Sequence, residues 1–243
     1  NSEVLNVRTK KCAMAFMYLI VLCAFVAAVI CSDHCITVLS ENAPFKDRTC
    51  VILDAGHGGE DGGAVSISGT AESAINLEIT RRLNDLFHII GVETLMIRED
   101  DISVYTSGTS LSEKKISDLK QRVKVINGKE NAILLSIHQN HYSDQKYCGA
   151  QVFYASTEGS DLLARSLQAN IVSALNLGNN RRTKKADGVY LLKHINCTGV
   201  LIECGFISNP QEEAMLKNSE YQKKLCCVIA TTVSNYLDHS QSH

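Results

Sequence analysis

Hydrophobic positions recur along the chain in two patterns: short apolar runs typical of buried strands, and wider spacings typical of amphipathic helices. The apolar runs predict strands at residues 51–53, 92–97, 132–137, 149–155, 189–192 and 199–202. The helical spacing predicts helices at residues 71–90, 113–127, 161–177, 209–217 and 221–237. The polar segments 99–112 and 179–187 are predicted to be surface loops. Because strands alternate with helices, the sequence predicts an α/β domain with a largely parallel sheet.

The N-terminal part of the chain has a different pattern. Residues 1–11 carry basic side chains, residues 12–31 carry no charge, and residues 32–46 are polar. An apolar stretch of about 20 residues crosses a hydrocarbon core of ~30 Å, and a basic flank stays on the cytoplasmic side. We therefore expect a cytoplasmic flank, a transmembrane anchor and a tether, followed by a folded domain at 47–243 outside the membrane. A cleaved signal peptide is the alternative, because alanines lie near the end of the apolar stretch.

Composition and cysteine spacing narrow the class of protein. The chain has 243 residues and a net charge of −2, enough for one well-cored domain. Near-neutral charge and the lack of tryptophan give no support for nucleic-acid binding. The ten cysteines contain no Cys-x-x-Cys pair, which excludes a zinc knuckle or a thioredoxin motif. We expect the scattered cysteines to be small buried side chains rather than a disulfide framework.

The first predicted strand ends in a glycine-rich loop that contains His57. In α/β folds, ligands bind at the carboxyl ends of the strands. The loop lacks the spacing of Gly-x-Gly-x-x-Gly and of the Gly-Lys-Ser/Thr phosphate loop, so it does not favour nucleotide binding. Taken alone, the loop fits a tight turn with an incidental histidine.

Three further polar residues stand near the ends of predicted elements. Glu72 begins the first helix, and His138 and Glu203 each follow a buried strand. Two imidazoles and one carboxylate form a known catalytic zinc set with one open position, and a further carboxylate beside it provides a general base. The structural alternatives are a hydrogen-bonded histidine, a glutamate that favours the helix dipole, and a buried acid bound by backbone amides. The spacing alone leaves both interpretations open.

Four segments of the sequence resemble a known family. They are Asp54–Ala64, Ala71–Leu77, Leu135–Asn140 and Leu201–Pro210. In this order they are similar to the zinc-dependent N-acetylmuramoyl-L-alanine amidases of bacterial cell walls, the amidase-3 family, over about residues 50–238. The resemblance implies a six-stranded sheet flanked by helices, and a bound Zn²⁺. It also implies roles for four residues: metal ligands at His57, Glu72 and His138, and a catalytic acid and base at Glu203.

The reaction implied by this resemblance is hydrolysis of the amide between the lactyl group of N-acetylmuramic acid and L-alanine in peptidoglycan. The loop and helix at Thr106–Asn127 are most similar to the germination-specific spore-cortex amidases of the family. Such an enzyme removes stem peptides from the cortex, a step towards the muramic-δ-lactam needed for germination. We expect action on the extracytoplasmic side, which in a sporulating cell is the intermembrane space around the forespore. Regulation is expected from a protein partner or from the timing of expression.

Other residues are weaker candidates. Asn140, Arg181 and Arg182 are candidates for substrate binding, although a solvated basic loop explains the arginines equally well. Asp54 and Asp61 are candidates for orienting a ligand imidazole from behind.

Three rival functions fit the sequence less well. A vegetative cell-separation amidase is disfavoured by the expected anchor, by the 106–127 segment and by the lack of wall-binding repeats. A non-catalytic wall-binding protein on the same fold is disfavoured because all four metal and acid positions are present. A general metallopeptidase would require a His-Glu-x-x-His motif, which the sequence lacks.

Overall fold

A computed structural model of the chain describes residues 49–175 and 179–240. The expected cytoplasmic flank, anchor and tether at residues 1–46 lie outside the described residues. Within the described ranges, no helix has both the length and the apolar composition that a membrane crossing requires.

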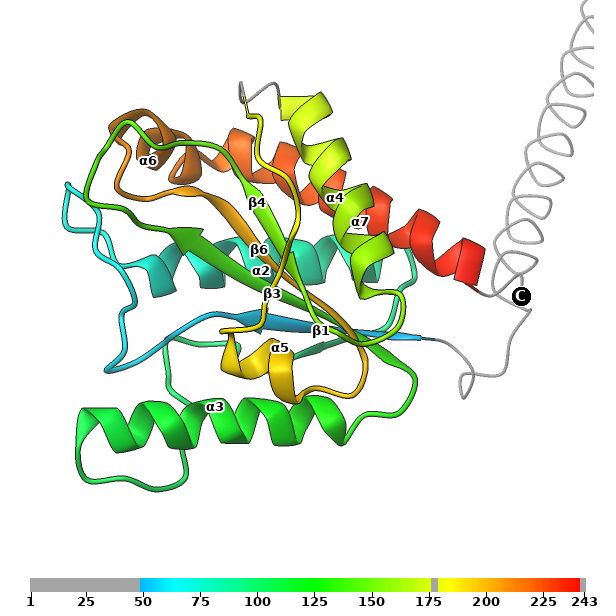
Figure 1. The fold of residues 1–243 in the computed structure, drawn as a ribbon, viewed down its shortest axis with the longest axis horizontal. Helices are drawn as coiled ribbons and strands as arrows, with labels where there is room; N and C mark the ends of the chain where they lie inside the picture. The colour runs from blue at the N-terminus through cyan, green and yellow to red at the C-terminus, as the bar shows by residue number, and fades with distance from the viewer. Residues whose placement is uncertain (1–48, 176–178, 241–243) are drawn as a thin grey trace, which may run out of the picture. The chain divides into compact units, whose positions relative to one another are not determined.

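The described residues form one α/β domain built on a six-stranded sheet (Figure 1). Its elements are, in chain order, β1 (Cys50–Ala55), α2 (Glu72–Ile89), β2 (Thr94–Met96), α3 (Leu111–Asn127), β3 (Ala132–Asn140), β4 (Gln151–Tyr154), α4 (Ser160–Leu175), β5 (Lys184–Lys185), α5 (Tyr190–His194), β6 (Thr198–Phe206), α6 (Pro210–Leu216) and α7 (Ser219–Ser240). The strand order is β2-β1-β3-β6-β4-β5. Only the β4–β6 pairing is antiparallel. The prediction of a mostly parallel, six-stranded sheet flanked by helices is confirmed.

Helices cover both faces of the sheet, with α2, α4 and α7 on one face and α3 and α5 on the other (Figure 1). Alternate residues of β1 face the two layers: Val51 and Leu53 pack with the first set of helices, and Cys50 and Ile52 pack on the opposite face. All six residues of β1 are buried. This burial on both faces explains the near-continuous apolar runs of the central strands.

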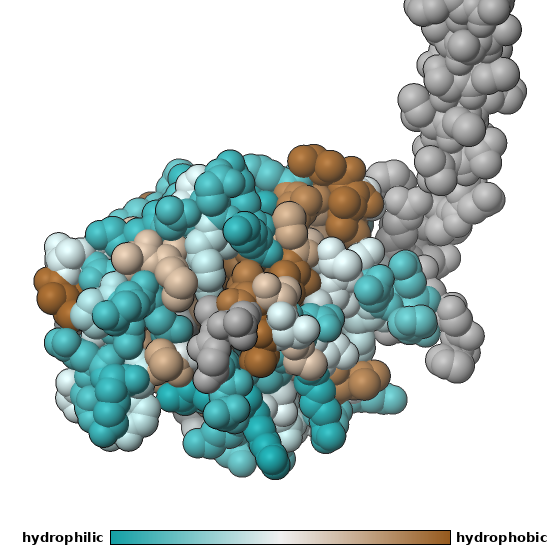
Figure 2. Space-filling model, turned by 90° about the horizontal axis from the view of Figure 1, so that it is seen from above, coloured by the Kyte–Doolittle hydropathy of each residue, from teal (hydrophilic) through white to brown (hydrophobic). Residues whose placement is uncertain are grey.

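The outer surface is mixed. In the view from above, hydrophilic side chains cover most of the described domain and hydrophobic side chains form smaller separate areas (Figure 2). All six described cysteines are free, and Cys50, Cys204 and Cys226 are buried as expected. The expectation of burial was wrong for Cys148 and Cys227, which are exposed.

One predicted strand was wrong. Of residues 189–192, Val189 is the N-cap of helix α5 and the other three are its first residues, and the remaining strand of the sheet is β5, inside the segment predicted as a basic loop. Leu191, Leu192 and Ile195 all lie in the same buried cluster. Adjacent residues of a strand point to opposite faces, whereas a helix places such a set on one side. A run of four apolar residues is too short to distinguish the two periods.

Two strands were predicted too short at their carboxyl ends, where candidate site residues lie. β3 and β6 continue in parallel register beyond the apolar runs, so His138 and Glu203 lie within paired strands rather than after them. The two residues are direct register partners on neighbouring strands. The sheet therefore fixes their backbones side by side.

Candidate metal centre

The turn that carries His57 is held by two buried arginines. Arg98 donates from Nε to the carbonyl of Ala55 at 2.9 Å and from Nη2 to that of Gly56 at 3.1 Å. Arg122 donates from Nη2 to the carbonyl oxygen of His57 at 2.7 Å. His57 has a left-handed backbone with φ of 61°, which is uncommon outside glycine and persists where the surroundings fix it. The two arginines therefore fix the backbone from which the His57 imidazole extends.

Glu72 is the first residue of α2 and is only 4% exposed. Its Oε2 accepts a hydrogen bond from the amide of Ala64 at 3.0 Å, and its Oε1 accepts one from the amide of Gln139 at 3.1 Å. Burial alone would raise the pKa of Glu72, but the hydrogen bond with His138 and the charge of both imidazoles outweigh burial and lower this pKa to about 2. Glu72 is therefore an ionised carboxylate across the physiological pH range.

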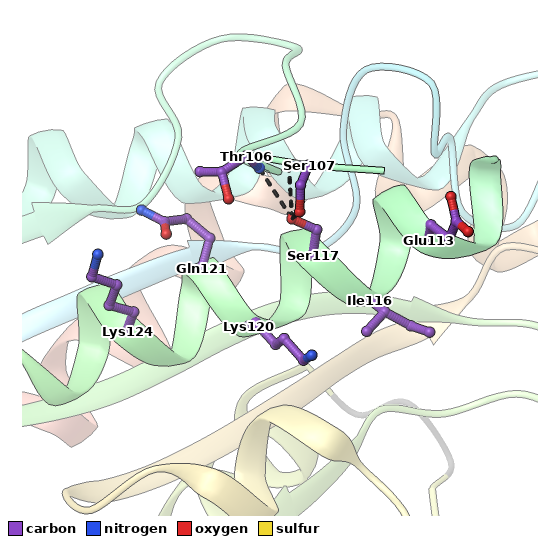
Figure 3. A pocket seen from close by; sticks show the side chains of 8 residues that line it. All are labelled: Thr106, Ser107, Glu113, Ile116, Ser117, Lys120, Gln121 and Lys124. Carbon is purple, nitrogen blue, oxygen red and sulfur yellow. Dashed lines mark hydrogen bonds between the residues drawn. The ribbon is translucent and has the colours of Figure 1, made fainter. Parts of the chain in front are cut away.

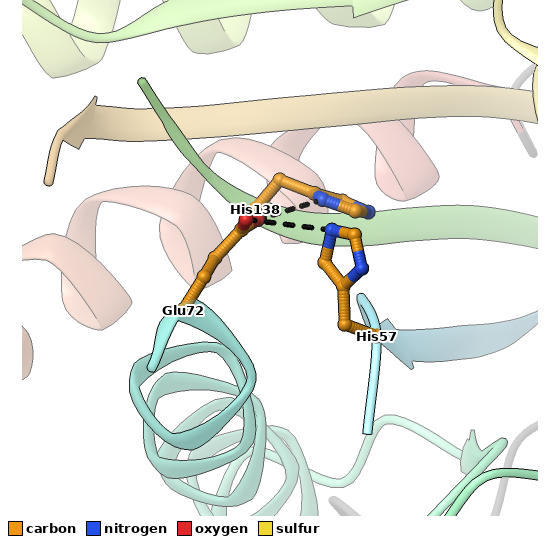
Figure 4. Close-up of side chains that lie close together, drawn as sticks. All are labelled: His57, Glu72 and His138. Atoms are coloured by element: carbon orange, nitrogen blue, oxygen red, sulfur yellow. Dashed lines mark hydrogen bonds and ion pairs between the residues drawn. The ribbon is translucent and has the colours of Figure 1, made fainter. Parts of the chain in front are cut away.

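His57, Glu72 and His138 converge from three elements (Figure 4). His57 Nε2 lies 3.4 Å from Glu72 Oε2, and His138 Nδ1 lies 3.0 Å from Glu72 Oε1. One ligand atom from each residue lies within 4.8 Å of the other two. A tetrahedral metal with bonds of about 2.1 Å separates its ligand atoms by roughly 3.4 Å. The donor set and its spacing therefore fit a zinc ion.

Asp61 and Asp54 have different surroundings, although both were candidates for orienting a ligand. Asp61 Oδ2 lies 3.0 Å from Nδ1 of His57, the arrangement typical of a metal-bound imidazole and its outer partner. Asp54 forms an ion pair with Arg122 and accepts a hydrogen bond from Ser136 at 2.6 Å. The carboxylate of Asp54 therefore positions Arg122, and Arg122 in turn binds the backbone carbonyl of His57.

Glu203 differs from Glu72 in its hydrogen bonding and in the direction of its pKa shift. Its Oε2 is buried and is one of two buried side-chain N or O atoms without a hydrogen-bond partner among the described residues, the other being Oε1 of Gln139. Burial raises the pKa of Glu203 to about 7; the nearby His138 opposes this rise and Glu72 adds to it. A buried carboxylate with a pKa near neutrality and a free oxygen is suited to exchange a proton with a substrate.

The three substrate-binding candidates lie on both sides of the strand that carries Glu203: Asn140 is on β3, and the two arginines are on the β4 side. Asn140 ends β3, two residues after His138. Arg181 donates from Nη1 to Gln151 Oε1 at 3.1 Å, and Gln151 is the register partner of Glu203 on β4. The side chain of Arg182 is exposed, and its backbone carbonyl accepts a hydrogen bond from Gln151.

The cavities beside α3 differ in whether they border the metal candidates. A cavity of about 300 Å³ lies between α3 and α5, and both His57 and His138 line it. A second cavity of about 390 Å³ runs along α3 beside the 106–107 segment, where two backbone amides bind Ser117 (Figure 3). None of the candidate ligands lines the second cavity. The first cavity therefore borders the candidate centre, as does a smaller pocket lined by His57 and Asp61.

The sequence profile of a family described as N-acetylmuramoyl-L-alanine amidase matches residues 51–235. The chain belongs to this amidase family. It is 38% identical over 189 residues to the germination-specific N-acetylmuramoyl-L-alanine amidase of Bacillus subtilis, covering 76% of this chain and 78% of that protein. It is also 30% identical over 190 residues to the amidase LytC of Bacillus subtilis, covering 76% of this chain and 35% of that protein.

A solved member of the amidase family has a similar fold. The CwlD amidase of Clostridioides difficile, determined in complex with the GerS lipoprotein, superposes with a TM-score of 0.75 and is 37% identical. The match covers 79% of this chain and 99% of that chain. The predicted resemblance to the amidase-3 family and to its germination-specific members is confirmed.

Gly63 offers a test of how closely the ligands pack. It has φ of 70°, and a Cβ there would lie 2.6 Å from Glu72 Oε2 and 2.7 Å from His57 Cδ2. We expect Gly63→Ala to displace both ligands and to lower zinc affinity about tenfold or more. Competition with a chromophoric chelator measures this affinity. The matched control is Gly69→Ala, which has φ of 86° and no atom within 4 Å of the added methyl group. Equal zinc affinity in the two variants would contradict the expectation.

The Asp54–Arg122 pair predicts a pH-dependent contribution to stability. Burial alone would raise the pKa of Asp54, but Arg122 and the hydroxyl of Ser136 outweigh it and hold this pKa below its usual value. The lowered pKa means that the stabilisation is fully present above about pH 4 and is lost as the pH falls through the folded-state pKa. Asp54→Asn should therefore lower the free energy of unfolding by about 3 kcal/mol at pH 7.

Urea unfolding of both proteins at pH 7 and pH 3 measures this effect. The difference between wild type and Asp54→Asn should shrink at the lower pH. Asp161→Asn, which removes an exposed ion pair with Arg165, is the control and should change stability by less than about 1 kcal/mol. A difference that stays constant with pH would contradict the assignment.

Proposed function

We propose that this protein hydrolyses the amide bond between the lactyl group of N-acetylmuramic acid and L-alanine, with zinc held by His57, Glu72 and His138. One observation carries the proposal. The three side chains converge within 4.8 Å, and Glu203, with an unpartnered buried oxygen, is the register partner of His138. Membership of the amidase family supports the choice of bond.

In the proposed reaction, some residues of the chain hold and orient the metal, and Glu203 transfers the proton. Zinc, when bound, polarises the substrate carbonyl and lowers the pKa of water. Asp61 keeps the imidazole of His57 oriented through its 3.0 Å hydrogen bond. Glu203 accepts the proton of the attacking water at its free oxygen and delivers it to the leaving amine of L-alanine. In the metal-free protein, burial raises the pKa of Glu203 to about 7, which suits a carboxyl group that both accepts and donates a proton.

For the biological substrate we propose spore-cortex peptidoglycan, from which the enzyme removes stem peptides on the way to muramic-δ-lactam. The similarity to a germination-specific amidase supports this choice. We further propose that residues 1–11 are a cytoplasmic flank, 12–31 an anchor or signal segment and 32–46 a tether, with the catalytic domain at 47–243 on the extracytoplasmic side. The similar CwlD amidase was determined with the GerS lipoprotein, which supports an activating protein partner for this chain.

The test uses the full chain, loaded with zinc, on purified vegetative peptidoglycan and on spore cortex, with products identified by mass spectrometry. Free stem peptides with new L-alanine amino termini are expected, and Glu203→Ala should abolish them. Equal cleavage of both substrates would point to a vegetative cell-separation amidase. Intact muropeptides from both, with zinc bound and a candidate lipoprotein partner added, would favour a non-catalytic wall-binding protein.

A further inference from the structure

The segment between β3 and β4 exposes two tyrosines, and it directly follows the strand that carries His138. Tyr142 is 53% exposed and Tyr147 is 39% exposed. Within residues 49–175 and 179–240, every other phenylalanine and tyrosine is buried or partly buried. The two rings contact each other edge to face, with centroids 4.7 Å apart and an interplanar angle of 75°. Paired, exposed aromatic rings are typical of binding surfaces, because their faces are apolar and their hydroxyl groups are polar.

Buried polar groups fix this segment in place. The amide of Tyr142 donates to Ser208 Oγ at 3.0 Å, and Asn209 Nδ2 donates to the carbonyl of Gln145 at 2.8 Å. Further along, the amide of Gly149 donates to Glu212 Oε1 at 2.8 Å. All three partners follow β6 and are buried. The tyrosines are therefore presented at a fixed position, which lowers the entropy cost of binding.

Contacts through Phe206 and Arg181 join Tyr147 to β6, the strand that carries Glu203, and to its neighbour β4. The ring of Tyr147 lies 6.4 Å from the ring of Phe206, three residues after Glu203 on β6. The guanidinium of Arg181 stacks on Phe206 at 4.6 Å and binds Gln151, the β4 partner of Glu203. The tyrosines thus lie towards β4, whereas the 300 Å³ cavity lies between α3 and α5.

The charges around the tyrosines are already paired. Lys146, whose ammonium lies 5.5 Å from the centroid of Tyr147, forms an ion pair with Asp144 at 2.8 Å. Arg181 is occupied by Phe206, Gln151 and the carbonyl of Cys148. The surface therefore offers exposed aromatic rings, that of Tyr142 the more exposed, rather than a free cation for the carboxylates of a stem peptide. A neutral pyranose ring, with C–H groups on one face and hydroxyl groups at its rim, matches this chemistry.

We propose that Tyr142 and Tyr147 form a saccharide subsite that stacks against a pyranose ring of the glycan strand. This subsite rests on the proposed amidase function, and it deepens that function by assigning the sugar side of the substrate to the segment between β3 and β4. The peptide side then extends towards the cavity between α3 and α5.

Direct binding tests the subsite without turnover. Peptide-free glycan oligosaccharides are titrated calorimetrically into the full chain loaded with zinc. The double variant Tyr142→Ala/Tyr147→Ala should bind at least tenfold more weakly, while Tyr147→Phe, which keeps the ring, should bind within about twofold of wild type. The matched control is Leu162→Ala, which removes a side chain that is 59% exposed on α4. Equal affinity of wild type and double variant, or no binding by wild type, would overturn the proposal.

Turnover separates this proposal from the proposed function. The substrates are glycan strands with stem peptides and a lactyl-peptide that lacks the sugar. Relative to wild type, the double variant should have a higher KM for the glycan. This increase in KM should be at least tenfold larger than the increase for the lactyl-peptide, and kcat should change much less. Cleavage by wild type without this difference would leave the amidase function standing and reject the subsite. If wild type binds the glycan, the double variant does not, and neither protein cleaves it, the subsite stands and the amidase function is rejected. Loss of a protein partner by the double variant, with glycan affinity unchanged, would also reject the subsite.

Discussion

Glu203→Gln is expected to lower kcat about 1000-fold while leaving zinc binding intact. An amide occupies the same volume as the carboxylate but cannot accept the proton of the attacking water, and general acid–base groups contribute about 10²–10⁴-fold. Glu203 lies outside the three-residue ligand cluster, so the metal affinity should not change. Steady-state release of stem peptides measures kcat, and chelator competition measures zinc affinity.

The same variant has an expected effect on stability. Burial raises the pKa of Glu203 to about 7 in the folded protein. The free energy of unfolding therefore falls as the pH rises from the pKa of this group in the unfolded chain to above 7. In the metal-free protein at pH 8, Glu203→Gln should therefore unfold at a higher temperature than wild type. A variant that retains the wild-type rate, or that loses zinc along with its activity, would contradict the role assigned to Glu203.

Glu72→Ala is expected to have the second large effect, loss of the metal itself. Removal of an outer partner of a metal ligand typically costs 10–100-fold in affinity, and removal of a ligand should cost more. The change also leaves the amides of Ala64 and Gln139 without their acceptor. The variant should therefore copurify with far less than one zinc per chain and show no amidase activity.

Asp61→Asn provides the graded comparison, because Asp61 contacts His57 without belonging to the ligand cluster. Zinc affinity is expected to fall in the order wild type, Asp61→Asn, Glu72→Ala. The absorption spectrum of the cobalt-substituted proteins reports the ligand set independently of activity, and circular dichroism reports the fold. If Glu72→Ala, still folded, bound zinc as tightly as Asp61→Asn, Glu72 would not be a ligand.

The sequence was informative where its signals are local. Long helices such as α2 and α3 were predicted within a few residues, because their apolar positions repeat over several turns. The convergence of His57, His138 and Glu203 followed from parallel strands that end at one edge. The short helix α5 was missed because four apolar residues carry no usable period.

The arginines around His57 mark the limit of reasoning from local pattern. The guanidinium of Arg98 binds the backbone carbonyls of Ala55, Gly56 and Ser73. The roles of Arg98 and Arg122 depend on contacts across 25 to 68 positions of the chain. No spacing rule signals such contacts, although an arginine on the apolar side of a predicted helix, such as Arg122, is a usable warning.

The position of Arg122 on α3 has a consequence for the order of assembly. The carbonyl oxygen of His57 is fixed by a side chain 65 positions later in the chain, and His138 comes later still. A growing chain that has formed β1 and α2 thus lacks both the imidazole and the brace that complete the centre. If the centre holds zinc as proposed, metal capture follows completion of α3 and β3, and the free energy of zinc binding stabilises the folded state rather than its precursors.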